Sequence, residues 1–215
     1  MTYFRQFNKN IKRALRLLLE SIFPNMAVHI LKGRLKGMKW IVSSGNPRYC
    51  LGTYEHKHQE LFTKTITEGV FVYDIGAHVG FYTLLASVLV GNGGRVIAFE
   101  PLPRNIHYLK KHLQLNHCNN VTLIEAAVGG KSGNAFFRIE PSSYTGYLST
   151  EGRFKVKLVG LDEIVLNGEI PPPDYIKMDI EGGEYLALLG AREILIKYHP
   201  TIFLSTHGIE VHQKC

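Results

Sequence analysis

Three carboxylates stand at the carboxyl ends of apolar segments that have the length of strands. These residues are Asp74, Glu100 and Asp179. Parallel strands all end at the same edge of a sheet, and ligands bind there at the point where the strand order reverses. The three side chains are therefore predicted to gather at one edge and to form a binding or catalytic site.

Two glycines follow the first of these carboxylates, in the stretch DIGAHVG at 74–80. Gly76 is predicted to let the backbone approach a ligand closely, with Ala77 beside it, and Gly80 is predicted to open a helix. The G-x-G-x-x-G pattern of dinucleotide sites is absent, and Asp74 would repel a pyrophosphate. A carboxylate here suits a ligand with cationic groups, such as S-adenosyl-L-methionine, which carries a sulfonium and an amino group.

The next two strand ends suit the nucleoside part of such a ligand. Glu100, followed by Pro101, comes 24 positions after Gly76, where a carboxylate can accept hydrogen bonds from ribose hydroxyls. The third strand ends in small residues that leave room for an adenine ring. The residues predicted to border the adenine are Glu125, Ala126 and Ala127.

Three side chains are candidates for a general base. An alcohol acceptor must lose a proton as its oxygen attacks, so a base is needed within reach. Asp179 and Glu181 lie at the fourth strand end, and His207 lies at the fifth. The alternative for the two carboxylates is that one caps the helix that opens at Gly182 and the other binds passively.

The elements that must position these residues alternate along the chain. We expect strands at 70–75, 95–100, 121–127, 175–180 and 200–205, with helices near 81–90, 103–116 and 183–197. This alternation predicts an α/β fold of the Rossmann-like class, a mostly parallel sheet with helices on both faces. The AFFRI and FKVKLVGL stretches predict extra short strands within 128–172. The chain ends soon after the fifth strand, so we expect the last strands of such a fold to be missing.

The basic charge of the chain is concentrated before residue 41. The net charge is +7, yet residues 1–40 carry nine Lys or Arg against one acidic residue. We therefore predict an appendage at 1–49 and a binding domain at 50–215, and no nucleic-acid partner. A β-hairpin is expected at 30–45. Residues 1–23 have the pattern of a basic amphipathic helix, which either contacts a membrane surface or packs on protein.

Composition narrows the remaining classes. The three cysteines have no CxxC spacing, so neither a disulfide framework nor a zinc site is expected, and a cytoplasmic setting fits best. The spacing of His207, His212 and Cys215 is not a usual zinc pattern, and no metal is predicted. A divalent ion between Asp179 and Glu181 is an alternative that no sequence feature supports.

Several stretches together resemble the FkbM family of S-adenosylmethionine-dependent methyltransferases. They are LGTYE at 51–55, VYDIGAHVGFYTLLAS at 72–87, RVIAFEPLPRN at 95–105, LNHCNNVTLIEAAVG at 115–129 and DYIKMDIEGGEYLALLGA at 174–191. The resemblance implies an enzyme that methylates a hydroxyl of a sugar, a glycan or a secondary metabolite. It also implies that Tyr54 and Glu55 close the site from the segment before the core. The alternatives are a cofactor-binding or scaffold protein without catalysis and, with less support, an NAD(P)-dependent oxidoreductase.

Overall fold

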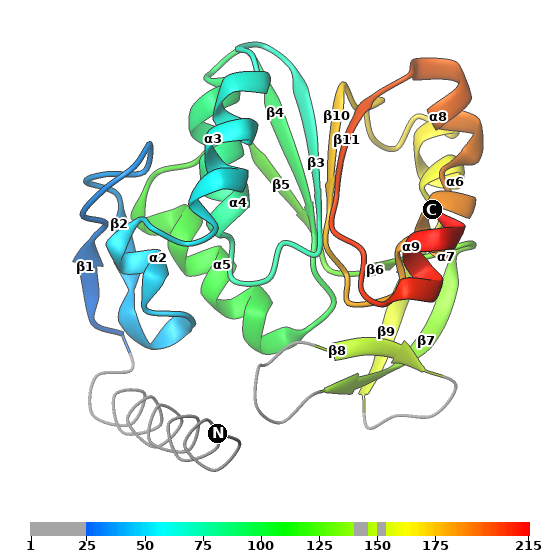
Figure 1. Cartoon of the computed structure of the whole chain (residues 1–215), viewed down its shortest axis with the longest axis horizontal. Coiled ribbons are helices and arrows are strands. Elements are labelled where there is room, and N and C mark those ends of the chain that lie inside the picture. The colour runs from blue at the N-terminus through cyan, green and yellow to red at the C-terminus, as the bar shows by residue number, and fades with distance from the viewer. Residues whose placement is uncertain (1–24, 140–145, 150–153) are drawn as a thin grey trace. The chain divides into compact units, whose positions relative to one another are not determined.

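The computed structural model describes residues 25–139, 146–149 and 154–215 (Figure 1). These residues fall into two compact units, which are divided between His56 and Lys57. The amphipathic helix predicted at 1–23 lies outside the described residues, so its membrane contact stays a prediction. Within the described part of the chain, no helix has both the length and the apolar character needed to cross a bilayer.

The first unit is built on a short antiparallel hairpin of β1 (Ala27–His29) and β2 (Lys39–Ile41). The hairpin predicted at 30–45 is present, but only β2 lies within that range, because β1 ends at His29. A 3-10 turn (Val42–Ser44) and the short helix α2 (Arg48–Leu51) follow. The core of this unit contains the fully buried Trp40.

The second unit is organised by a parallel sheet of five strands in the order β11-β10-β3-β4-β5. In chain order the strands are β3 (Phe71–Ile75), β4 (Arg95–Phe99), β5 (Val121–Ile124), β10 (Tyr175–Met178) and β11 (Thr201–Leu204). The first strand therefore lies in the middle, and the order reverses between β3 and β10. This is the doubly wound order 3-2-1-4-5, which confirms the predicted Rossmann-like α/β class.

Helices cover both faces of this sheet (Figure 1). One face carries α3 (His56–Thr65), α4 (Phe81–Val90) and α5 (Pro103–Leu115), and α5 starts with a proline at its first position, as helices favour. The other face carries α6 (Leu161–Leu166), α7 (Glu184–Leu189) and α8 (Arg192–Tyr198). The main core lies on this second face, where inward residues of three strands, such as Tyr73, Phe99 and Met178, pack under α6, α7 and α8. The last helix is α9 (Ile209–Lys214).

Two predicted elements differ from the observed ones. The single helix expected at 183–197 is divided into α7 and α8 at Gly190, where a Cβ would lie 2.1 Å from the carbonyl oxygen of Gly129. The strand expected at 121–127 is also divided. Its last residue starts β6 (Ala127–Val128), which leaves the main sheet and pairs with β9.

A second, four-stranded sheet in the order β6-β9-β7-β8 occupies the interval after β5. Its other strands are β7 (Gly133–Ile139), β8 (Gly146–Ser149) and β9 (Phe154–Val159). The strands predicted from AFFRI and FKVKLVGL are therefore confirmed as β7 and β9. Leu102, Ala127 and Val156 form a small core beside this sheet.

Candidate functional site

The reversal point between β3 and β10 brings two loops into backbone contact. Gly76 follows β3 with a φ of +81°, and a Cβ there would lie 2.1 Å from the carbonyl oxygen of Asp179, which follows β10. Only glycine fits, because both the left-handed φ and the lack of space exclude a side chain. Asp179 is thereby fixed against the first loop.

Gly80, four residues further on, is also a glycine because of a close contact within the protein. Gly80 has a φ of +95°, and a Cβ there would lie 2.3 Å from Cδ1 of Leu109 on α5. From the sequence, Gly76 is expected to make room for a ligand. In the structure, both glycines make room for other parts of the protein. Their role in lining a cofactor site stays a prediction.

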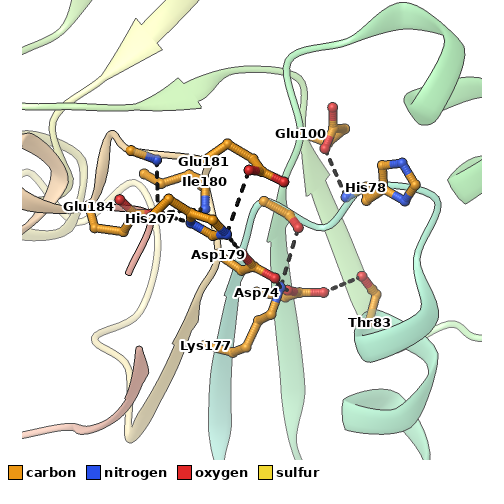
Figure 2. A network of polar contacts seen from close by, with 12 residues as sticks. Asp74, His78, Thr83, Glu100, Lys177, Asp179, Ile180, Glu181, Glu184 and His207 are labelled. Carbon is orange, nitrogen blue, oxygen red and sulfur yellow. Dashed lines mark hydrogen bonds and ion pairs between the residues drawn. The ribbon is translucent and has the colours of Figure 1, made fainter. Parts of the chain in front are cut away.

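Asp74 is buried beneath this loop, with 1% of its surface exposed. Its Oδ2 accepts a 2.6 Å hydrogen bond from the hydroxyl of Thr83 on α4, and Nζ of Lys177 lies 3.4 Å from its Oδ1 (Figure 2). From the sequence, this carboxylate is expected to face a cationic group of the ligand. In the structure, a lysine of the protein already supplies a positive charge.

Lys177 joins the two loops and is a site residue that was not predicted from the sequence. Its Nζ lies 3.4 Å from the carbonyl oxygen of Gly76, 3.9 Å from Oδ2 of Asp179 and 5.2 Å from the centre of the Tyr82 ring. A lysine inside the otherwise apolar strand YIKM is the signal that points to it, because buried lysines are rare unless they are paired.

Glu100 ends β4 and is 4% exposed. Its carboxylate accepts hydrogen bonds from the backbone N–H of His78 (2.8 Å), the backbone N–H of Leu102 (3.0 Å) and the side-chain amide of Asn105 (3.2 Å). Burial and, to a lesser extent, the charge of Asp74 outweigh these three hydrogen bonds and raise the pKa of Glu100 to about 7.

The hydrogen bonds of Glu100 leave capacity for a ligand. A carboxylate offers about four acceptor positions, of which the described donors fill three. The remaining position suits a ribose hydroxyl, so this strand end fits the nucleoside of S-adenosylmethionine. His78 shapes the turn with a φ of +52°, a left-handed conformation that is uncommon outside glycine.

The residues predicted around the adenine lie in different environments. Ala126 is fully buried and belongs to the main core, and Ala127 is 7% exposed in β6. Glu125 is half-exposed and forms an ion pair with Lys110 of α5, with 2.5 Å between Nζ and Oε1. Pro101 is partly buried directly after Glu100.

The three candidate bases come together beyond β10 and β11. Nε2 of His207 lies 3.5 Å from Oδ1 of Asp179 and 3.6 Å from Oε2 of Glu181 (Figure 2). Glu181 has a left-handed φ of +56°, and Gly182 follows it at +102°. Such strain in a residue other than glycine is typical of functional sites.

A fourth acidic residue completes this cluster. Glu184, the first residue of α7, is fully buried, and its Oε1 lies 2.9 Å from Nδ1 of His207. The same oxygen accepts hydrogen bonds from the N–H groups of Ile180 (3.3 Å) and Gly182 (3.1 Å). The sequence offers Asp179 or Glu181 as the residue that caps this helix, whereas in the structure Glu184 accepts the N–H groups that precede it.

Two further expectations complete the predicted set. Tyr54 and Glu55 belong to the first unit, where the Tyr54 ring contacts that of Tyr49 at 4.6 Å, and their closure of the site stays a prediction. Among the described residues, no group of three His, Cys, Asp or Glu side chains is arranged to hold a metal ion. All three cysteines are free.

The fold and these strand ends define a Rossmann-like protein with its polar cluster at the reversal point. The sequence of the methyltransferase FkbM domain matches residues 74–214, and the chain belongs to this family.

One curated relative is the hexuronic acid methyltransferase AglP of Haloferax volcanii, which is 28% identical over 137 residues, covering 63% of this chain and 55% of the relative. The chain thus spans about half the length of that relative. A solved methyltransferase FkbM from Methylobacillus flagellatus KT is 23% identical with a TM-score of 0.47, over 62% of this chain and 32% of that one. Trm5b from Pyrococcus abyssi is 19% identical with a TM-score of 0.44, over 79% and 38%.

Proposed function

We propose that this chain transfers a methyl group from S-adenosyl-L-methionine to a hydroxyl oxygen of a sugar or glycan. The proposal rests on two features that occur together at the strand ends. Glu100 is a buried carboxylate that can still accept a hydrogen bond. Asp179, Glu181 and His207 form a polar cluster at the reversal point. Membership of the FkbM family supports the reaction, and a relative named for hexuronic acid supports a sugar acceptor. A hydroxyl of a secondary metabolite is the alternative acceptor.

The protein's part in this reaction is to bind, to orient and to move a proton. When bound, S-adenosylmethionine supplies a methyl group on a positively charged sulfur, which keeps the electron pair of the broken carbon–sulfur bond. Glu100 would hold the ribose. Asp179 and Glu181 would accept hydrogen bonds from acceptor hydroxyls, since carboxylates are strong acceptors. Alignment of the acceptor oxygen with the methyl carbon then lowers the entropic cost of the reaction.

The test is a methyl-transfer assay with chemically defined acceptors. The full chain is incubated with isotopically labelled S-adenosylmethionine and a panel of glucuronides, galacturonides and neutral hexosides, and labelled products are identified by mass spectrometry. We expect label on a hydroxyl oxygen of at least one sugar. Transfer to none of these sugars by a chain that binds S-adenosylmethionine would contradict the proposal.

Substitution of the two flanking carboxylates sharpens the assay. Asp179→Asn and Glu181→Gln are expected to raise the KM for the acceptor more than they lower the affinity for S-adenosylmethionine, because they remove acceptors for sugar hydroxyls. Glu169→Gln, an exposed acid-to-amide change in the same unit, is the matched control.

A further inference from the structure

The geometry points to Glu184 as the positioning residue that holds His207 as the general base of this site. The inference rests on the proposed function for the identity of the reaction. The position of the histidine between its acidic neighbours, in contrast, is given by the structure and can be tested without any acceptor.

The two nitrogens of His207 lie in different surroundings. Nδ1 is 2.9 Å from a buried oxygen of Glu184, a hydrogen-bond distance. Nε2 is 3.5 Å from Asp179 and 3.6 Å from Glu181, which is too long for a strong hydrogen bond. Figure 2 shows the ring with Glu184 on one side and the other two carboxylates on the opposite side. The first nitrogen is held by a hydrogen bond within the protein, whereas the second has only these two longer contacts.

Glu184 determines which nitrogen carries the proton. A carboxylate can only accept hydrogen bonds, so Nδ1 of a neutral His207 must donate to it. The lone pair is then on Nε2, the nitrogen that faces the carboxylates beyond β10. A hydroxyl placed between His207 and those carboxylates would give its proton to Nε2 as its oxygen takes the methyl group.

The base and the residue that orients it differ in their exposure to solvent. The side chain of Glu184 has no exposed surface, so it cannot meet an acceptor, while the side chain of His207 is 35% exposed. Glu184 is also held in place, because its Oε1 takes the N–H groups of Ile180 and Gly182 in the loop that carries Asp179 and Glu181. One buried oxygen therefore fixes the imidazole and the loop together. The second oxygen, Oε2, accepts no hydrogen bond from any described residue.

The charges around the ring favour its role as a proton acceptor. Burial on its own would lower the pKa of His207, but the hydrogen bond to Glu184 and the charges of Glu181, Asp179 and Glu184 raise it above its ordinary value. Two groups from neighbouring elements also act on this cluster. Nζ of Lys177 on β10 lies 3.9 Å from Oδ2 of Asp179. Cys215 follows α9, and burial and the charge of Glu184 raise the pKa of its thiol. An imidazolium formed by proton transfer is thus stabilised where it forms.

The first test uses the wild-type chain without cofactor or acceptor. The full chain is labelled with ¹⁵N-histidine, and the ring signals of His207 are assigned by their loss in His207→Gln. Above its pKa, the imidazole is expected to carry its proton on Nδ1. A ring with its proton on Nε2 would overturn the proposal, and this outcome requires no variant of Glu184 to fold.

The second test removes the charge of the positioning residue. In Glu184→Gln, the pKa of His207 should fall, because a charged hydrogen-bond acceptor becomes neutral. Glu193→Gln changes an exposed acid in the first turn of the neighbouring helix α8 and should leave the His207 titration unchanged. An unchanged pKa of His207 in Glu184→Gln would overturn the proposal.

The third test measures turnover with a sugar methylated in the acceptor panel. His207→Gln should lower kcat by roughly 100- to 10,000-fold with unchanged affinity for S-adenosylmethionine, as expected for loss of a general base. In Glu184→Gln, the acid limb of the pH–rate profile should move to lower pH together with the measured pKa of His207. Full turnover in His207→Gln would overturn the proposal, whereas an inactive wild type would count against the proposed function and leave the two titrations to decide the Glu184–His207 pair.

Discussion

Glu100 is the residue whose charge state should govern cofactor binding. The raised pKa of about 7 means that the native chain keeps this proton until near neutrality, while an unfolded chain loses it near 4.5. A charged carboxylate is a stronger acceptor for a ribose hydroxyl than the protonated acid. Affinity for S-adenosylmethionine should therefore rise by roughly tenfold from about pH 6 to about pH 8.

Calorimetric titrations across that pH range check this expectation. Glu100→Gln should bind more weakly and show no such rise, since the amide does not titrate. The exposed Glu169→Gln should keep the wild-type profile. A rise of the same size in Glu100→Gln would assign the pH dependence to another group.

Lys177 and Asp74 form a buried pair whose members depend on each other. Lys177→Met should destabilise the chain by about 3–5 kcal/mol, because it leaves the charge of Asp74 buried without its partner. Asp74→Asn combined with Lys177→Met should recover much of this loss. Chemical denaturation of the four proteins of the cycle measures the coupling, with the exposed Lys64→Met as control. Additive effects of the two changes would contradict the pairing.

These residues mark how far the site could be predicted from the sequence. Carboxylates at strand ends are visible in a sequence because apolar segments precede them, and the structure brings Asp179, Glu181 and His207 together as expected. Lys177 and Glu184 were missed because their importance depends on which loops touch. That contact joins segments about 100 residues apart, from Gly76 to Asp179, and no local pattern encodes it.

At the scale of elements, the loops after β3 and β10 can touch only because residue 76 has no side chain. Gly76→Ala should destabilise the chain strongly, because its Cβ would overlap the Asp179 carbonyl at 2.1 Å. Gly69→Ala is the matched control, since Gly69 has a similar φ of +86° but no atom within 4 Å of an added Cβ. The control should cost about 1 kcal/mol from backbone strain alone.

Thermal or chemical denaturation of both variants separates steric overlap from strain. We expect a clearly larger loss of stability for Gly76→Ala, with loss of S-adenosylmethionine binding in any fraction that folds. Equal losses in the two variants would mean that the loops are not in contact as described.

Helix α5 is tied to the first loop by a buried histidine. Nδ1 of His112 lies 2.7 Å from the carbonyl oxygen of Val79, and burial, opposed by this hydrogen bond, lowers the pKa of His112 to about 4. The unfolded chain takes up this proton near pH 6.5 and the native chain only near pH 4, so stability is full above 6.5 and is lost as the pH falls toward 4. The loss attributable to His112 should reach up to about 3 kcal/mol.

The free energy of unfolding measured against pH tests this link. Glu100 acts in the opposite direction between pH 4.5 and 7, so the difference between variant and wild type is the informative quantity. His112→Gln should remove part of the acid sensitivity, whereas the exposed His107→Gln on the same helix should retain it. Identical pH dependence in His112→Gln and wild type would contradict the expected titration.

Element boundaries were predictable where local signals mark them. The predicted helix at 81–90 is α4 as observed, because glycines flank an apolar run, and Pro103 marks the start of α5. The break between α7 and α8 was not predictable, because the obstacle at Gly190 is a carbonyl from a distant turn. The exit of β6 from the main sheet likewise depends on pairing with β9, about 30 residues later.

At the scale of the molecule, the parallel strands place Asp74, Glu100 and Asp179 at their carboxyl ends, along one edge of the five-stranded sheet. We propose that this edge binds S-adenosyl-L-methionine through the carboxylate of Glu100 and so serves methyl transfer. Binding by a ligand also stabilises the native state by mass action, which gives a second readout on the same samples.

The most direct measurement is isothermal titration of S-adenosylmethionine and S-adenosylhomocysteine into the 215-residue chain, into Glu100→Ala and into the control Glu169→Ala. We expect both ligands to bind the wild type and the control with Kd values of about 1–100 μM. We expect at least a roughly tenfold loss of affinity in Glu100→Ala, in line with a lost hydrogen bond to a charged group. No binding by the folded wild-type chain, or equal binding by Glu100→Ala, would contradict it.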